Sequence, residues 1–325
     1  MGHKINGYVG HIEDFDLSLY RGAYQIRNFT FKKKEGKQEI PFITIKFADI
    51  SVAWRALFKG KILADLKIVD SRIDFIDSSD KKKRQLGIED KPSNWINIYE
   101  KIVPFSLERF QFINGEVHFQ NKEFKAPIDL YVNSIDLDAQ DIHNSKGASS
   151  RLVSKYKLTA LVLNKSKISS DGSFNILSKP VAFDVNLKME KVKLIDLNRF
   201  LLAYGPFDIT SGTFSLYSEI ASNQNKIKGY IKPVFEKVDV VSGKEHINSL
   251  KRFGFEYGTA ILNLIFRDGR QYNVAAKVPI SGDLNKPSIQ FWEGFNSAFK
   301  NAFGIKKVEN KIDNEINLNS VPKKK

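Results

Sequence analysis

The chain contains five histidines, the residue type that most readily exchanges protons and binds metals near neutral pH: His3, His11, His118, His143 and His246. No two of them are separated by two or four residues, the spacing that would bring a pair to one metal ion on a strand or a helix. The sequence has no cysteine, which excludes disulfides, thiolate ligands and a cysteine nucleophile. We therefore expect no metal site and no cofactor.

Carboxylates gather in three clusters, which are Glu13-Asp14-Asp16, Asp74-Asp77-Asp80 and Asp136-Asp138-Asp141. General acid–base catalysis needs two carboxylates that converge in a cleft. These residues alternate along predicted strands or lie in turns, so most of them should point to water. They also lack the closing glutamate of a calcium-binding loop. The sequence has no phosphate-binding glycine loop and no nucleophile elbow, and we predict no catalytic residue and no enzymatic activity.

The 325-residue chain is basic, with 51 lysines and arginines against 37 aspartates and glutamates and a net charge of +14. This charge favours polyanionic partners, either nucleic acid or an anionic membrane surface, although a lysine-rich solvated surface gives the same composition. The phenylalanines fall on the apolar phase of predicted strands, as at Phe110 and Phe112, and not between lysines where they could stack on bases. We therefore predict no nucleic-acid binding.

No stretch of the sequence is long and apolar enough to cross a membrane as a helix. The longest uncharged runs have ten residues, such as Tyr257–Phe266, whereas a spanning helix needs about 20 apolar residues. Residues 1–20 hold no apolar core of a signal peptide. With 42% hydrophobic residues, the chain can still bury a sizeable core.

Alternation of apolar and polar residues with a period of two dominates the chain and predicts about 15 strands. Val181–Met189 is apolar at every odd position, and Tyr272–Ile280 is apolar at every even position. Two segments, Tyr24–Phe31 and Ile43–Trp54, change phase part-way along. A phase change within a strand is typical of a β-bulge, which also curves the sheet.

Helical periodicity appears in three short amphipathic segments, Trp95–Ile102, Leu197–Tyr204 and Trp292–Phe303. Asp196 is the predicted N-cap of the second segment, and Gly205 is the predicted C′ residue just beyond its end. Because each segment has one apolar side, each is expected to lie on an apolar surface, most simply as a plug over the edge or end of a sheet.

The fold class that follows is mainly β: a long curved antiparallel sheet, forming an open groove, with a few short amphipathic helices. The pair Asn114-Gly115 is typical of a type I′ turn and predicts a hairpin at that point. Residues 77–91 form a charged linker. We predict one elongated domain over residues 1–303, followed by a polar, basic tail over residues 304–325.

Several stretches recur in a familiar order and spacing: Gly10–Tyr24, Val52–Gly60, Pro92–Trp95, Pro104–Val117, Pro127–Val132, Asp208–Tyr217 and Gly282–Pro287, with Trp292 and Asn301–Phe303 at the end. Together they resemble the DUF748 proteins, members of the AsmA-like superfamily of bacterial envelope proteins. The resemblance covers nearly the whole chain, from Gly7 to Phe303.

The resemblance implies a periplasmic β-rich body that an N-terminal helix anchors in the inner membrane of a Gram-negative-type cell. Larger AsmA-like proteins are elongated β-grooves implicated in phospholipid transport and outer-membrane biogenesis. Their membrane helix ends about where Met1 stands here. We therefore expect the reading frame to extend upstream of Met1 by about 20 mainly apolar residues, with Lys or Arg on the cytoplasmic side.

Two functions remain open at this point. In the first, acyl chains of phospholipid lie on the apolar side of the sheet, and a periplasmic or outer-membrane protein is a further partner. In the second, the apolar side is closed into an ordinary core, and the protein is an envelope scaffold or assembly factor without lipid cargo. For the first function, the predicted lipid-lining residues are Phe183, Val185, Leu187, Phe214, Leu216, Val274 and Val278.

Overall fold

A computed structural model describes residues 8–34, 40–54, 63–80, 82–85, 106–142, 152–175, 182–204, 208–240, 272–275, 277–284 and 311–321. The chain forms two compact units. Unit 1 comprises Met1–Lys146 and Val153–Asn164, and unit 2 comprises Gly147–Leu152 and Lys165–Lys325. Each unit is built on an open β-sheet, so the predicted mainly β class is confirmed.

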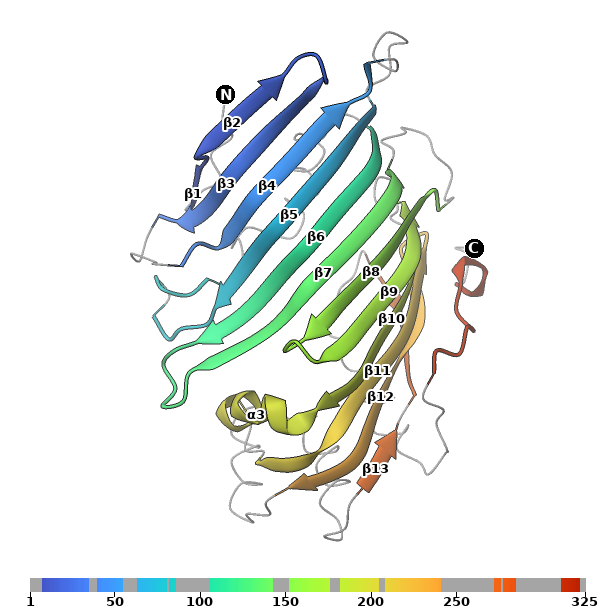
Figure 1. Ribbon diagram of the computed structural model, residues 1–325. Coiled ribbons are helices and arrows are strands. Elements are labelled where there is room, and N and C mark those ends of the chain that lie inside the picture. The colour runs from blue at the N-terminus through green and yellow to red at the C-terminus, as the bar shows by residue number, and fades with distance from the viewer. Residues whose placement is uncertain are drawn as a thin grey trace. The chain divides into compact units, whose positions relative to one another are not determined.

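Eight strands make up the described part of unit 1 (Figure 1). They pair in the order β1-β3-β4-β5-β6-β7-β8, and β2 pairs with β3 beside β1. Their bounds are β1 Tyr8–His11, β2 Asp14–Ser18, β3 Ala23–Lys33, β4 Ile43–Val52, β5 Leu63–Ile76, β6 Ser106–Asn121, β7 Ile128–Ile142 and β8 Ser154–Val162.

All pairs in unit 1 are antiparallel except β5 and β6, which run parallel. A parallel pair needs a long connection that returns the chain to the starting edge of the first strand. The charged linker predicted at residues 77–91 falls within this connection. Its described part returns to the sheet at Gln85, which bridges to Ile76.

The hairpin predicted at Asn114-Gly115 is wrong, because β6 continues through both residues to Asn121. Asn114 does adopt the left-handed conformation that an Asn-Gly pair favours, with φ 53°. The result is a β-bulge, where the register of β6 against β7 shifts between Phe112 and Val117. Both flanks of the bulge remain paired with neighbouring strands, so the chain bends there without reversing.

Left-handed residues form a row across the sheet of unit 1. Asn28, Asp70, Asn114 and Ser134 have φ angles of 50°, 51°, 53° and 48° and lie on β3, β5, β6 and β7. On β4, Lys46 occupies the position between Asn28 and Asp70, because the pairs on either side of these three residues are in register. The register of β5 with β6 likewise places Asp70 beside Asn114.

This row explains the predicted change of phase in β3, where the apolar positions move from Tyr24 and Ile26 to Phe29 and Phe31. The phase changes at Asn28, yet β3 and β4 keep one register on both sides of it. A single left-handed residue therefore produces the phase change in β3, and no extra residue is inserted as a bulge would require.

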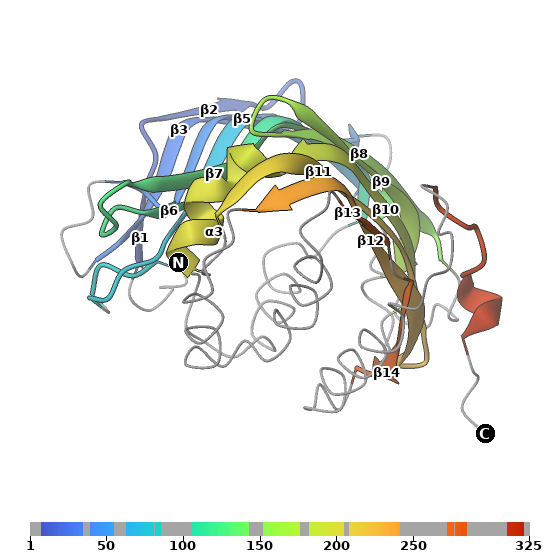
Figure 2. The same ribbon diagram turned by 90° about the horizontal axis from the view of Figure 1, so that it is seen from below.

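Unit 2 has six described strands in its sheet, and every described pair is antiparallel. They pair in the order β9-β10-β11-β12-β13, and β14 also pairs with β12. Strands β11 and β12 bend along their length (Figure 2). The bounds are β9 Ser166–Asn175, β10 Ala182–Lys193, β11 Ile209–Asn223, β12 Lys226–Val240, β13 Tyr272–Ala275 and β14 Val278–Asp283.

Two short helical elements join β10 to β11, the 3-10 helix η1 (Leu194–Leu197) and the α-helix α3 (Asn198–Tyr204). Leu197 and Leu201 pack against a core cluster on the ends of β11 and β12, which confirms that this amphipathic segment lies on an apolar surface. The predicted N-cap is wrong, because Asp196 lies inside η1. The other two predicted helices and Gly205 lie outside the described residues.

The second half of the predicted tail is part of the fold. Residues 311–321 lie on β11 and β12 and include the 3-10 helix η2 (Leu318–Ser320), whose N-terminus is stabilised by an Asn317–Ser320 capping box. Composition suggests a solvated tail because the segment is polar. Its polar groups instead find buried partners on the sheet.

Candidate functional site

The candidate site is one face of the sheet in unit 2. Residues that pair directly across strands share a face, and successive residues alternate between faces. Phe183, Val185 and Leu187 of β10 pair with Ser222, Ile220 and Ser218 of β11, which alternate with the same period as Leu216 and Phe214. The five predicted lining residues on β10 and β11 therefore occupy one face.

The same face continues across β12. Ser218 pairs with Ile231, which pairs in turn with Val278 of β14. Phe214 pairs with Phe235, which pairs in turn with Val274 of β13. Val274 is placed here by its backbone register alone. The seven predicted residues thus share one face by register.

This surface, which we call the apolar face of unit 2, carries no charge over its central rows. From Phe183 to Met189, the positions paired across β9, β10, β11 and β12 hold only apolar residues, serine, glycine and proline. The rows between them, which face the opposite way, contain Asp171, Asp184, Lys188, Glu219, Lys228 and Lys232. The sheet is therefore strongly two-sided.

Coverage of the apolar face differs from one position to another. Phe183, Val185, Leu187 and Leu216 are half-buried, whereas Val278 has no exposed surface. Phe214 is also half-buried, but it packs against the cluster that η1 and α3 form over the end of the sheet. The helical elements therefore close the face at Phe214, and the centre on β10 is the part best placed to receive a ligand.

The opposite face of unit 2 binds residues 311–321 through buried charges that we did not predict. The carboxylate of Glu219, which has no exposed surface, accepts backbone N–H bonds from Asn314, Glu315 and Ile316, the last two at 2.9 Å. Lys232, only 1% exposed, donates from Nζ to the Asp313 carboxylate at 2.6 Å. In the sequence, Glu219 and Lys232 stand out only as charged residues on interior strands. Their partners lie far away along the chain, so the pairing could not be predicted.

Further contacts to the segment come from Tyr230 and Lys277. The Tyr230 hydroxyl accepts the backbone N–H of Asp313 at 2.8 Å, and burial raises the pKa of this phenol above its ordinary value. Lys277 Nζ lies 2.7 Å from Asp313 and 2.6 Å from Glu315. Burial acts to raise the pKa of Asp313, but the bonds from Lys232 and Lys277 outweigh it and hold that pKa below its ordinary value.

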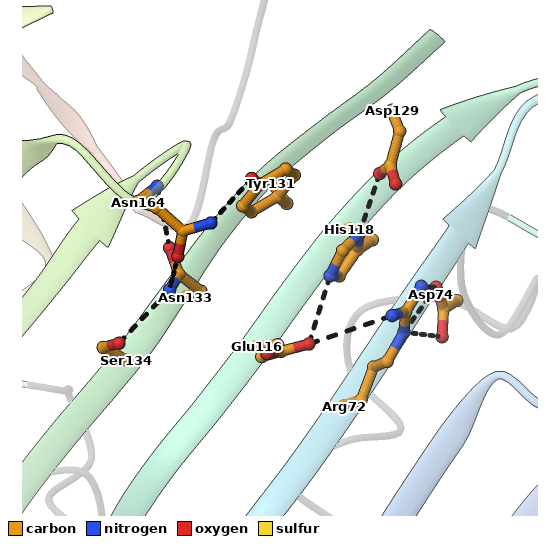
Figure 3. A network of polar contacts seen from close by, with 9 residues as sticks. All are labelled: Arg72, Asp74, Glu116, His118, Asp129, Tyr131, Asn133, Ser134 and Asn164. Carbon is orange, nitrogen blue, oxygen red and sulfur yellow. Dashed lines mark hydrogen bonds and ion pairs between the residues drawn. The ribbon is translucent and has the colours of Figure 1, made fainter. Parts of the chain in front are cut away.

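Unit 1 holds a second polar network, on β5, β6 and β7 (Figure 3). The Arg72 guanidinium donates to both oxygens of the buried Asp74, at 2.8–3.1 Å, and approaches Glu116 at 3.8 Å. His118 lies between Glu116, 3.3 Å from Nε2, and Asp129, 2.8 Å from Nδ1. The network thus joins Asp74 and Arg72 of β5 to Glu116 and His118 of β6 and to Asp129 of β7.

His118 was predicted on the polar side of its strand, and most of the clustered carboxylates were expected to point to water, to which Asp74 is an exception. Asp74 is 2% exposed and His118 is 6% exposed. The His118 ring stacks on Tyr131 at 4.9 Å, and the Tyr131 hydroxyl accepts from Asn164 at 2.9 Å (Figure 3). Burial of Asp74 is tolerated because Arg72, two residues away on the same strand, donates to both of its carboxylate oxygens.

The described residues show no metal-binding geometry. Among them, no group of three or more His, Asp and Glu side chains could hold a metal ion. Within the same ranges, no helix is long and apolar enough to cross a membrane. The networks described above join groups of the protein to one another, which is a structural role.

Comparison with known proteins adds no assignment. No family model matches the chain, and no curated protein matches it.

Proposed function

We propose that the protein is a non-enzymatic component of the cell envelope that binds phospholipid acyl chains on the apolar face of unit 2. The observation that carries the proposal is the uncharged, half-buried centre of this face around Val185 and Leu187. A soluble monomer rarely exposes a contiguous apolar patch of more than a few hundred Å². An acyl chain covers such a patch without requiring any polar partner.

The sheet of unit 1 supports the same reading. Tyr24 and Ile26 of β3 pair with Ile50 and Ala48 of β4, which pair with Leu66 and Ile68 of β5. Beyond the row of left-handed residues, the apolar residues shift by one position along each strand, as at Phe29 and Phe31 of β3. The backbone changes its alternation at the same row, so the same side of the sheet stays apolar. Each unit therefore presents one apolar side, as a lipid-binding sheet requires.

The wider setting of the proposal rests on the resemblance to AsmA-like proteins. It is a periplasmic location, with an anchor in the inner membrane, a contribution to phospholipid movement and outer-membrane biogenesis, and a periplasmic or outer-membrane protein as partner. Bound phospholipid stabilises the folded state, as any ligand does that binds only the native form.

The test is lipid extraction from the purified full chain, with one matched pair of variants. Leu187→Asp places a charge on the apolar face, whereas Ser169→Asp places the same charge on the opposite face, where Ser169 pairs with Lys188. An unpaired charge in a lipid-covered site costs several kcal/mol. We expect phospholipid in organic extracts of the wild type and of Ser169→Asp, and at least a tenfold loss in Leu187→Asp.

A closed core without lipid is the second candidate, and the cluster at η1 and α3 favours it. That cluster already covers Phe214 and Phe235 with Leu197 and Leu201. A wild-type protein that carries no phospholipid after gentle purification, while remaining folded and monomeric, would favour this scaffold or assembly role over lipid binding.

A further inference from the structure

The polar face of β11 and β12 is built to bind a peptide. Glu219, Tyr230 and Lys232 are at most 2% exposed, and Glu219 and Tyr230 are directly paired across the two strands. Charges buried this deeply need partners. The partners found for Glu219 and Lys232 lie between 81 and 97 residues further along the chain, in residues 311–321.

The contacts define the class of ligand that fits this surface. A single carboxylate accepts three successive backbone N–H groups, which is possible because Asn314 is left-handed with φ 57° and turns these groups toward one point. Next to it, the Asp313 carboxylate lies between the ammonium groups of Lys232 and Lys277. The ligand is therefore an acidic segment with an aspartate immediately before a tight backbone turn.

The segment behaves structurally as a ligand, because it adds no strand to the sheet. Residues 311–321 contain no β-strand, and their contacts to β11 and β12 run through side chains and a turn. Residues 284–310 separate the segment from β14 in the chain, so no short turn ties it to the sheet.

We propose that this surface of β11 and β12 is a peptide-binding site, which residues 311–321 occupy as an intramolecular ligand and which accepts the same segment from a second copy of the chain. Within one molecule, the connection gives the segment a high effective concentration, so the intramolecular form dominates. Exchange between copies becomes visible once the intramolecular contact is broken, as in domain-swapped dimers.

The test uses two full-length variants with complementary defects. Glu219→Gln keeps the size of the side chain but removes the charge that binds three N–H groups, so the site is lost and the segment is kept. Asn314→Pro removes one of those N–H donors and forbids the positive φ, so the segment is lost and the site is kept. The change lies outside the sheet and leaves the strands intact.

Mixed in equal amounts, the two variants should form a 1:1 complex by native mass spectrometry and light scattering. Each variant alone should stay monomeric, and the double variant should bind neither. A mixture that stays monomeric while both chains are folded would overturn the proposal, and so would dimers of either variant alone, which would reveal an unrelated interface. If Glu219→Gln does not fold, Lys232→Met, which removes the Asp313 partner, takes its place in the same mixture.

Discussion

At the scale of single residues, the polar face of unit 2 concentrates negative charge in a partly buried place. Asp184 of β10 lies near Glu219, and burial, followed by repulsion from Glu219, raises the pKa of the Asp184 carboxyl above its ordinary value. The backbone N–H of Leu318 donates to it, which acts in the opposite direction but does not outweigh burial. The ionised form of Asp184 is therefore less favourable in the folded protein than in the unfolded chain.

The first residue-scale prediction follows from the sign of this shift. At a pH well below the ordinary aspartate pKa, Asp184 is protonated in both the folded and the unfolded state and does not change the free energy of unfolding. As the pH rises through that value, the unfolded chain ionises first, and the folded state loses stability relative to it. Asp184→Asn keeps an oxygen for the Leu318 bond and removes the charge, so it should raise the melting temperature at pH 7 by about 2 °C.

The control is Asp16→Asn on β2, which makes the same change at an exposed position of unit 1. Thermal unfolding of both variants at pH 7 and pH 3.5 checks the prediction. The gain of Asp184→Asn should shrink at the lower pH. A gain that is equal at the two pH values, or a loss at pH 7, would show that Asp184 is not destabilised by its charge.

Asp313 carries a shift of the opposite sign, and it predicts how acid affects residues 311–321. Because its pKa is lowered in the folded protein, the contribution of Asp313 to stability is present above the ordinary aspartate pKa and is lost as the pH falls through the lower, folded value. The segment should therefore stay bound at pH 4.5 and detach in stronger acid.

A fluorescent label on an introduced Asn319→Cys, at an exposed position, checks this, since the chain has no other cysteine. Its anisotropy should fall in acid, and in Asp313→Asn it should be low already at pH 7. Release with a midpoint near neutral pH in the wild type would contradict the role given to Asp313.

At the scale of elements, the row of left-handed residues makes the sheet of unit 1 bend without losing its pairing. At Asn114, hydrogen bonds stabilise the strained left-handed backbone. Its amide side chain donates to Asp70 at 2.6 Å, and its backbone N–H donates to Asp136 at 2.9 Å. Lys46 lies 3.9 Å from the other oxygen of Asp70. The polar side chains in the row thus satisfy the groups that the bend would otherwise leave unpaired.

This geometry predicts a reversal of the usual strand preferences at Asn114. On an ordinary strand position, valine is more stable than glycine by up to about 1 kcal/mol. At φ 53° a β-branched residue is strained, by about 1–2 kcal/mol, while glycine is not. We therefore expect Asn114→Gly to have a larger free energy of unfolding than Asn114→Val, as measured by denaturant unfolding.

The control position for this comparison is Thr159 on β8, which is exposed and does not adopt the left-handed conformation. There, Thr159→Val should be more stable than Thr159→Gly. The same order of stability at both positions would show that the left-handed conformation of Asn114 does not control the local energy.

Much of this element-scale structure could be read from the sequence, and the parts that could not have a common cause. Alternation placed Phe183, Val185 and Leu187 on one face with Phe214 and Leu216, because side chains in a strand alternate by geometry alone. The same local pattern could not tell a turn from a bulge at Asn114-Gly115. That choice depends on whether β5 and β7 pair with both flanks.

The sequence also could not predict the partners of the buried charges. Glu219 and Lys232 look like ordinary solvated residues in sequence, and only pairing with a distant segment shows that they are buried. The polar composition of residues 311–321 pointed to solvent for the same reason.

At the scale of the whole molecule, the charge of +14 should act separately from the apolar face. Attraction of basic groups to anionic head groups is long-ranged but screened, since the Debye length falls from about 10 Å at 0.1 M salt to about 3 Å at 1 M. Acyl-chain binding is driven by burial of apolar surface, which added salt does not weaken in this way. The two effects can therefore be separated in one experiment.

Binding of the full chain to vesicles tests this separation. Vesicles with about one third phosphatidylglycerol should bind the protein at 50 mM salt and release most of it at 500 mM, because each basic residue near the surface contributes about 1 kcal/mol at most. Phosphatidylcholine vesicles are the control and should bind weakly at both salt concentrations. Leu187→Asp, which should lose its lipid cargo, should bind the anionic vesicles nearly as well as the wild type, because it changes the net charge by only one unit. Equal binding to both kinds of vesicle, or loss of anionic binding in Leu187→Asp, would show that the apolar face and not the charge brings the protein to membranes.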